Sequence, residues 1–409
     1  MRRESFVRWC NVAVIFLLSF AVAFILGGEC AYSKEVRGIT NDTVTIGIQA
    51  SMTGVAAEQF ADWVDGIRSY YRNINDQGGG IHGRKIKFIL EDTRYSMPLS
   101  AATFRKLIYK DKVFTLFGPD GTGQVKMLER QIQKLRVPCI GISMAKTVVQ
   151  PTQRYIFIAA TPYEDQINVM FDYLMNVLKL KEPRIAVVYL DVEYGKFCFR
   201  AAEERAKLYG LKIVDVETLS LMNLDPTSQV LNLKKSNADY VIIPLAGEFA
   251  VSVIKTAHKF GYNGTFLGNH YTCEDDVLRS LPFPVENYMG VHSFNSWHHE
   301  SPGMDNLRNL VLKDNPRSSP HRSRATIQGW ISSLLWAEGL RRAGKDLTIE
   351  AFVDALESIK KLDTEGICGP VALGPDDHIA ADYCRIYKAV PDKKIMAPLT
   401  DWMVPVTNR

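Results

Sequence analysis

The residues with the clearest potential for chemistry form a glycine-rich turn, Phe117–Thr122, with the sequence Phe-Gly-Pro-Asp-Gly-Thr. An apolar run, Val113–Phe117, precedes this turn and a helical apolar pattern follows it, so the turn joins a buried strand to the start of a helix. The free N–H groups and the positive dipole end of such a helix suit an anionic group. Gly121 permits close approach of a ligand, and Thr122 adds a hydroxyl. A connection that binds nothing explains the turn equally well.

Other kinds of site require motifs that this sequence lacks. No Gly-x-Ser-x-Gly nucleophile elbow occurs, and the turn lacks the Lys-Ser/Thr pair of a phosphate-binding P-loop. The turn also follows the third predicted strand, whereas a dinucleotide fingerprint follows the first. The absence of Cys-x-x-Cys spacing argues against a zinc or thioredoxin-like site. We therefore expect no cofactor, no bound metal and no enzymatic activity.

Two further clusters carry side chains that can bind ligands or metals. The members of the first are His292, His298, His299 and Glu300. Adjacent residues rarely point at one metal ion, so a solvated loop is the favoured interpretation. The members of the second are His321, Arg322 and Arg324, and a surface position is favoured for them. Arg324 is kept as a site candidate because it begins a long predicted helix.

Strands and helices alternate in two successive stretches, which predicts an α/β protein with mainly parallel sheets covered by helices. The strands of the first stretch are Thr43–Ala50, Lys85–Asp92, Val113–Phe117 and Pro138–Ile142. The strands of the second stretch are Ile185–Tyr189, Ile213–Thr218, Tyr240–Pro244 and Thr265–Gly268. A strand at Met289–Ser293, three helices and a C-terminal β region follow.

Sheets of this kind bind ligands beyond the carboxyl ends of their strands, at the point where the strand order reverses. The turns at 49–54, 118–123 and 143–147 all follow strands of the first stretch. We therefore expect these three turns to converge in space.

The N-terminal segment has the pattern of a secretory signal peptide. Basic residues precede an apolar run, Val12–Leu26, and Ala31-Tyr32-Ser33 offers small residues at a cleavage site. We expect residues 1–33 to be a cleaved signal peptide and the protein to be periplasmic. An uncleaved helix or a lipid on Cys30 is the alternative. The net charge of +4 is too small to predict binding to nucleic acid.

Export would permit disulfide bonds among the cysteines that remain. Five of the seven cysteines lie beyond Ser33, so at least one thiol is left without a partner. Cys368 and Cys384 flank a predicted hairpin around Gly374–Asp377, where cross-strand pairing is conceivable. Cys139 lies within a predicted strand and is expected to be a buried apolar residue.

Several collinear segments resemble one known family. The most specific is Asn75–Arg84, which reads Asn-Asp-x-Gly-Gly-Gly-Ile-x-Gly-Arg. Others are Val44–Ile48 with Thr53-Gly54, Gly118–Thr122, and Arg184–Tyr189 with Tyr194-Gly195. From about Thr43 to its C-terminus, the chain resembles the solute-binding proteins of ABC transporters in the branched-chain amino acid family.

The resemblance implies a type I periplasmic-binding fold, in which two lobes close around a hinge. It places residues 42–160 and 288–384 in the N-terminal lobe, and 161–287 and 385–409 in the C-terminal lobe. The chain would then cross between lobes near residues 160, 287 and 384. The implied partners are a small carboxylated solute and an ABC transporter permease, with the binding protein itself a monomer.

The family's ligand positions can be carried over residue by residue. They fall on Gln59, Gly121, Thr122, Ser143, Ala145, Lys146, Thr147, Tyr194 and His270. Members that bind amino acids carry an acidic residue after the strand that corresponds to Thr265–Gly268. Here His270 falls at or near that position, which favours a solute with a neutral or anionic far end over a zwitterion.

The match to the family can shift by one residue in this segment. Tyr271 or Glu274 could therefore supply the contact that the acidic residue makes in members that bind amino acids. The ligand class stays open between amino acids, amides, and aromatic or aliphatic acids. The resemblance favours a transport receptor over a ligand sensor that docks to a signalling partner. A secreted enzyme on a similar fold is the least favoured of the three functions.

Overall fold

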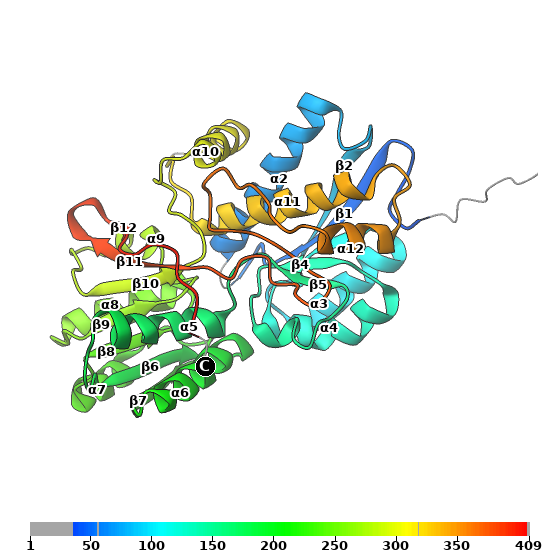
Figure 1. The fold of residues 1–409 in the computed structure, drawn as a ribbon. Coiled ribbons are helices and arrows are strands. Elements are labelled where there is room, and N and C mark those ends of the chain that lie inside the picture. The colour runs from blue at the N-terminus through cyan, green and yellow to red at the C-terminus, as the bar shows by residue number, and fades with distance from the viewer. Residues whose placement is uncertain (1–35, 55–56, 318, 407–409) are drawn as a thin grey trace, which may run out of the picture. The chain divides into compact units, whose positions relative to one another are not determined.

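The computed structural model describes residues 36–54, 57–317 and 319–406 (Figure 1). The predicted signal peptide and its alternatives lie outside these residues. Within them, no helix combines the length and the hydrophobicity that crossing a membrane requires.

The first sheet of the described chain has five parallel strands in the order β2-β1-β3-β4-β5. The strands are β1 (Thr43–Ala50), β2 (Lys85–Asp92), β3 (Thr115–Phe117), β4 (Cys139–Gly141) and β5 (Ile156–Ile158). The order reverses at β1, which lies between β2 and β3. The turns after β1 and β3 therefore lie together at the carboxyl edge of the sheet, as the sequence predicts.

The second sheet has seven strands within the described residues, in the order β12-β11-β10-β9-β8-β6-β7. Its parallel strands are β6 (Ile185–Leu190), β7 (Ile213–Leu219), β8 (Tyr240–Ile243), β9 (Thr265–Gly268) and β10 (Tyr288–His292). Its antiparallel strands are β11 (Arg385–Val390) and β12 (Ile395–Pro398). The sheet is therefore mainly parallel.

The first sheet and the helices associated with it are called the first lobe. These helices are α2 (Ala57–Gly78), α3 (Met97–Arg105), α4 (Thr122–Leu135), α10 (Pro302–Asp314), α11 (Arg324–Ala343) and α12 (Ile349–Glu357). Trp63 of α2 and Trp336 of α11 both contact Phe117 of β3, so α2 and α11 cover one face of the sheet.

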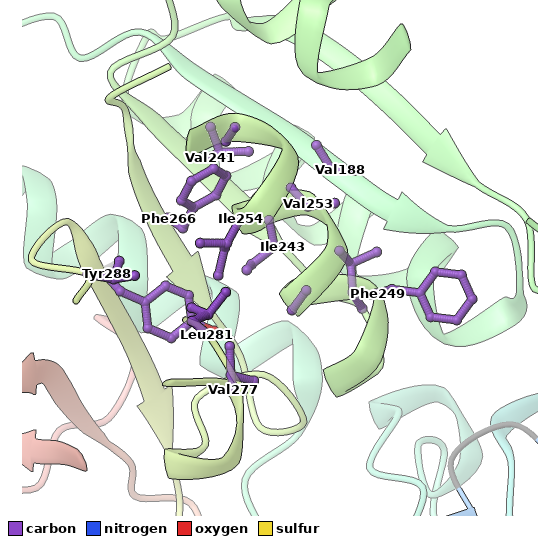
Figure 2. Close-up of a cluster of buried hydrophobic side chains, with 14 of the residues drawn as sticks. Val188, Val241, Ile243, Phe249, Val253, Ile254, Phe266, Val277, Leu281 and Tyr288 are labelled. Atoms are coloured by element: carbon purple, nitrogen blue, oxygen red, sulfur yellow. The ribbon is translucent and has the colours of Figure 1, made fainter. Parts of the chain in front are cut away.

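The second sheet and its helices are called the second lobe. The helices are α5 (Tyr163–Asp172), α6 (Glu193–Leu208), α7 (Thr227–Ser236), α8 (Gly247–Lys259) and α9 (Asp275–Arg279). Figure 2 shows the core of this lobe, where Val253 and Ile254 of α8 lie beside Val241, Ile243 and Phe266 of the sheet. All five side chains are buried, so apolar burial fixes α8 on the sheet.

Short helical turns extend or connect these elements. They are η1 (Lys106–Lys110), η2 (Lys146–Val148), η3 (Tyr173–Val177) and η4 (Pro391–Lys393). The turns η1 and η3 continue α3 and α5 as single π turns.

Helices α2 and α11 cross at two glycines. A Cβ on Gly66 would clash with the carbonyl oxygen of Thr326, and a Cβ on Gly329 would clash with that of Trp63. The two backbones therefore approach more closely than any larger residue would permit.

The second crossing between the sheets lies after His292, and its prediction near residue 287 is wrong. Residues Tyr288–His292 form β10, which pairs with β9 and β11 of the second sheet. The strand itself is predicted correctly, but a pattern of apolar residues does not specify the neighbouring strand. The other two crossings follow β5 and precede β11, and the full assignment of residues to lobes stays a prediction.

The pairing of Cys368 with Cys384 that the sequence leaves open is not formed. All five cysteines in the described part of the chain are free and buried. Cys368 forms a backbone bridge with Phe294, and Cys384 forms one with Met403, so the two lie in different strand-like pairings. Cys139 lies buried in β4, as predicted.

Candidate functional site

A cavity of about 50 Å³ lies between the two lobes, at the carboxyl ends of the strands. The first lobe contributes Gln59, Phe60, Tyr95, Asp120, Gly121, Thr122 and Ser143. The second lobe contributes Tyr163, Leu190, Val192, Tyr194, Leu221, Leu245, Ala246 and Tyr271. The side from the first lobe is thus the more polar, and the side from the second is mainly aromatic and aliphatic.

Five of the nine site residues expected from the sequence line this cavity. They are Gln59, Gly121, Thr122, Ser143 and Tyr194. The parallel topology explains the agreement, because the turns after β3 and β4 meet at one edge of the sheet.

Thr122 and Ser143 form the hydroxyl part of the cavity wall. Thr122 is the first residue of α4, and its Oγ1 lies 2.8 Å from Oγ of Ser143. The N–H of Val125 donates to the carbonyl of Gly121 and begins the hydrogen bonding of α4. The N–H groups before Val125 have no acceptor within the helix, so they are suited to an anion in the cavity.

Asp120 is the most informative residue that the sequence interpretation missed. Its carboxylate is buried, and Oδ2 accepts hydrogen bonds from Thr93 Oγ1 and, at 2.6 Å, from Ser51 Oγ. Within the described residues, the other oxygen, Oδ1, has no hydrogen-bond partner. Burial raises the pKa of Asp120, while the two hydroxyl donors act in the opposite direction. One carboxylate oxygen of this cavity-lining residue is therefore left without a donor.

Three tyrosines form the aromatic wall. The ring of Tyr163 contacts those of Tyr194 and Tyr271 at centroid distances of 4.8 and 5.8 Å. Tyr194 donates its hydroxyl to Asn269 Oδ1 at 2.7 Å. Burial raises the pKa of all three tyrosines, so the wall is uncharged at neutral pH.

Tyr271 links the two lobes directly. Its hydroxyl donates to the carbonyl oxygen of Ile142, which follows β4 in the first lobe, at 2.8 Å. The hydroxyl of Tyr163 lies 2.6 Å from that of Tyr271. Since Tyr271 uses its hydrogen on Ile142, Tyr163 is the donor in this pair.

His270 does not line the cavity. Its ring is buried, stacks on His292 at a centroid distance of 4.1 Å, and places Nε2 3.0 Å from Gln328 Oε1 on α11. The amide nitrogen of Gln328 donates to Ile142, so Gln328 presents its oxygen to the histidine. Burial lowers the pKa of His270 to about 3, and the ring is neutral.

The neighbouring residue, Tyr271, faces the cavity in place of His270. A tight turn sets this orientation, because the N–H groups of Thr272 and Cys273 both donate to the carbonyl of Asn269. His270 therefore gives no support to a solute with a neutral or anionic far end.

The segment 145–147 also lies away from the cavity. Lys146 forms an ion pair with Asp165 at 3.0 Å, and its N–H donates to the carboxylate of Glu164. Lys146 and Thr147 line a separate surface pocket, and Ala145 is buried before η2. These interactions anchor the loop and leave Ser143 as its contribution to the cavity.

Arg324 is buried, which contradicts the surface position favoured from the sequence. Its guanidinium donates to the carbonyl of Cys273, lies 3.6 Å from Glu274, and stacks over the ring of Tyr387. Arg324 thus joins α11 of the first lobe to the second lobe, outside the cavity lining.

Comparison with known proteins supplies independent evidence. Residues 43–394 match the family model described as periplasmic binding protein. An amino acid binding protein of Pseudomonas aeruginosa is 24% identical over 244 residues, which are 59% of this chain and 64% of that protein. A Leu/Ile/Val-binding protein homolog of Brucella suis is 24% identical over 253 residues, 60% of this chain and 61% of that protein. The chain thus covers less than two thirds of the length of each relative.

Two solved structures share the fold. A branched-chain amino acid ABC transporter protein from Thermus thermophilus with bound valine has a TM-score of 0.83 and 22% identity, covering 90% of this chain and 98% of that one. A fatty acid ABC transporter substrate-binding protein from Thermomonospora curvata has a TM-score of 0.80 and 20% identity, covering 90% and 94%. The predicted fold class, two lobes each with a mainly parallel sheet flanked by helices, is confirmed.

Proposed function

We propose, from the premise that this chain belongs to the periplasmic binding protein family, that it captures a small solute outside the cytoplasmic membrane for an ABC importer. Its family and its structural neighbours are solute-binding proteins. The two neighbours described above bind an amino acid and, by name, a fatty acid, so the solute must be argued from the cavity itself.

The observation that carries the proposal is the division of the cavity between the two lobes. A solute carboxylate would bind the hydroxyls of Thr122 and Ser143 and the N–H groups at the start of α4. Tyr194 and the other second-lobe tyrosines would cover the apolar part of the solute. A ligand that contacts both lobes stabilises the closed arrangement, which is how hinge closure would follow from binding.

Asp120 narrows the class of solute. A buried carboxylate oxygen without a partner is costly, and a ligand N–H group would satisfy it. A simple aliphatic or aromatic acid would instead bring a second carboxylate into the same cavity. The proposed solute is therefore an amino acid or an amide, with its nitrogen at Asp120.

A thermal-shift screen tests the proposal on protein freed of co-purified ligand. The probes are amino acids, amides, and simple acids such as benzoate and butyrate. A ligand at 100 times its Kd stabilises the native state by about 2.7 kcal/mol, which raises Tm measurably. We expect shifts with particular amino acids or amides. Shifts with simple acids alone would contradict the assignment of Asp120, and no shift with any probe would contradict solute binding.

Changing Asp120 to Asn should weaken binding of an amino acid solute by about 10- to 100-fold, since a hydrogen bond to a charged group contributes about 1.5–3 kcal/mol. Isothermal titration calorimetry measures this change. Asp346→Asn is the matched control, because Asp346 is exposed and lies outside the cavity lining. Equal affinities for the Asp120 variant and the control would remove Asp120 from the site.

The affinity for an ammonium-bearing solute should also decrease as the pH is lowered. Burial raises the pKa of Asp120, so this residue takes up a proton at a higher pH than an ordinary aspartate and then loses its charge attraction for the ligand. Calorimetry from pH 7.5 downwards should show the decline in the natural protein and a flatter profile in Asp120→Asn. Parallel profiles for the two proteins would contradict this role.

A further inference from the structure

A cluster of three metal-ligating side chains lies outside the solute cavity. Asp275, His298 and His321 each place one ligating atom within 4.8 Å of the others. They come from three separate segments: the start of α9, the loop between β10 and α10, and the loop between α10 and α11. Of the group named from the sequence, which is His292, His298, His299 and Glu300, only His298 belongs to this cluster.

The distances suit a small divalent cation. His298 Nε2 lies 3.5 Å from Asp275 Oδ2, and the rings of His298 and His321 face each other with centroids 5.4 Å apart. In a tetrahedral zinc site with bonds of 2.0–2.1 Å, neighbouring ligand atoms are about 3.3 Å apart. Small side-chain rotations would therefore complete the coordination.

Ligating atoms of both buried members lack a hydrogen bond. Within the described residues, Asp275 Oδ2 and His321 Nδ1 have no hydrogen-bond partner, while His321 Nε2 lies 3.0 Å from Asp276 Oδ1. The side chains of Asp275 and His321 are 2% and 6% exposed, so water compensates little for these missing bonds. A bound cation would satisfy these atoms at once.

The surroundings hold the ligands in place. The other carboxylate oxygen of Asp275, Oδ1, accepts a hydrogen bond from the N–H of Met396 in β12 at 2.7 Å, which orients Oδ2 toward the histidines. Asp276 Oδ1 lies 3.0 Å from His321 Nε2 and offers a second carboxylate. The side chain of His298 is 43% exposed, which leaves a route for the ion and space for a coordinated water.

We propose that Asp275, His298 and His321 form a binding site for a divalent transition metal, with zinc the best match to two imidazoles and a carboxylate. The ion would join α9 of the second lobe to the two loops on either side of α10. The second of these loops, which carries His321, leads into α11. The ion would therefore strengthen the connection between the lobes. The site is independent of the solute cavity, so its failure would leave the proposed function untouched.

Calorimetry with zinc chloride on chelator-treated protein without a histidine tag tests the site. We expect one zinc ion per chain and a rise in Tm of about 2–5 °C when the site is saturated. His298→Ala and His321→Ala should each weaken zinc binding by at least about tenfold, the usual scale even for residues that only support a metal ligand. His299→Ala is the matched control, because His299 is adjacent in sequence and outside the cluster.

Cobalt substitution gives a second measurement that does not depend on affinity. Tetrahedral coordination by nitrogen and oxygen ligands should produce visible absorption, which is lost in His298→Ala. The proposal is overturned if zinc does not bind, or if it binds equally well to His298→Ala, His321→Ala and the control. A rise in Tm on acidification without any zinc dependence would also overturn it, since a protonated His298–Asp275 ion pair would then explain the cluster.

Discussion

Thr122→Ala and Tyr194→Ala should each weaken solute binding by at least about tenfold, which corresponds to about 1.4 kcal/mol. Thr122 supplies a hydroxyl from the first lobe and Tyr194 an aromatic surface from the second. A hydrogen bond to a charged group contributes about 1.5–3 kcal/mol, and a buried aromatic surface contributes a similar amount. Calorimetry with the solute identified by thermal shift measures both losses.

Two conservative variants separate the contributions. Thr122→Ser keeps the hydroxyl and should restore most of the affinity. Tyr194→Phe should bind almost normally, because the hydroxyl of Tyr194 is already used on Asn269 and the ring is the part that covers the solute.

Tyr189→Ala is the matched control for the aromatic variant. Tyr189 belongs to the same lobe, stacks on Phe199, and lies outside the cavity lining. Unchanged affinity in both Thr122→Ala and Tyr194→Ala would remove this cavity as the binding site.

The second large effect concerns stability. Gly329→Ala should lower the free energy of unfolding by about 2 kcal/mol or more, although alanine is favoured over glycine in a helix by about 1 kcal/mol. The added Cβ would clash with the carbonyl oxygen of Trp63 and push α2 away from α11. Gly66→Ala should act in the same way through Thr326, and valine at either position should be worse.

Urea unfolding monitored by circular dichroism measures these changes. Gly247→Ala is the control, because the nearest atom to its added Cβ would be 4.0 Å away at the start of α8. We expect this variant to be neutral or slightly more stable. Equal stability of Gly329→Ala and Gly247→Ala would show that the contact between α2 and α11 can relax.

The fold follows from the sequence wherever local patterns decide it. β1, β2 and β9 have the predicted bounds because their apolar patterns are clear and turn residues limit them. The convergence of Thr122 and Ser143 also follows, since it depends only on parallel strands having their carboxyl ends at one edge.

The errors concern features that tertiary contacts decide. The three residues of β5 give no periodic pattern, and β10 has the expected place in the chain but pairs in the second sheet. Tyr271 faces the cavity in place of His270 because of one tight turn. A pattern of residue types does not show which of two neighbouring side chains such a turn directs into a cavity. Asp120 stands inside the turn that the sequence singled out, and its importance depends on Ser51 and Thr93, which only the fold brings to it.

The most direct test of solute binding in this cavity is a crystal structure of the protein with the solute that gives the largest thermal shift. We expect electron density for the solute in the cavity, with its carboxylate at Thr122 and Ser143, its nitrogen at Asp120, and Tyr194 against its apolar part. A solute bound instead in the neighbouring groove lined by Glu248 and Asp276, or elsewhere on the protein, would contradict it.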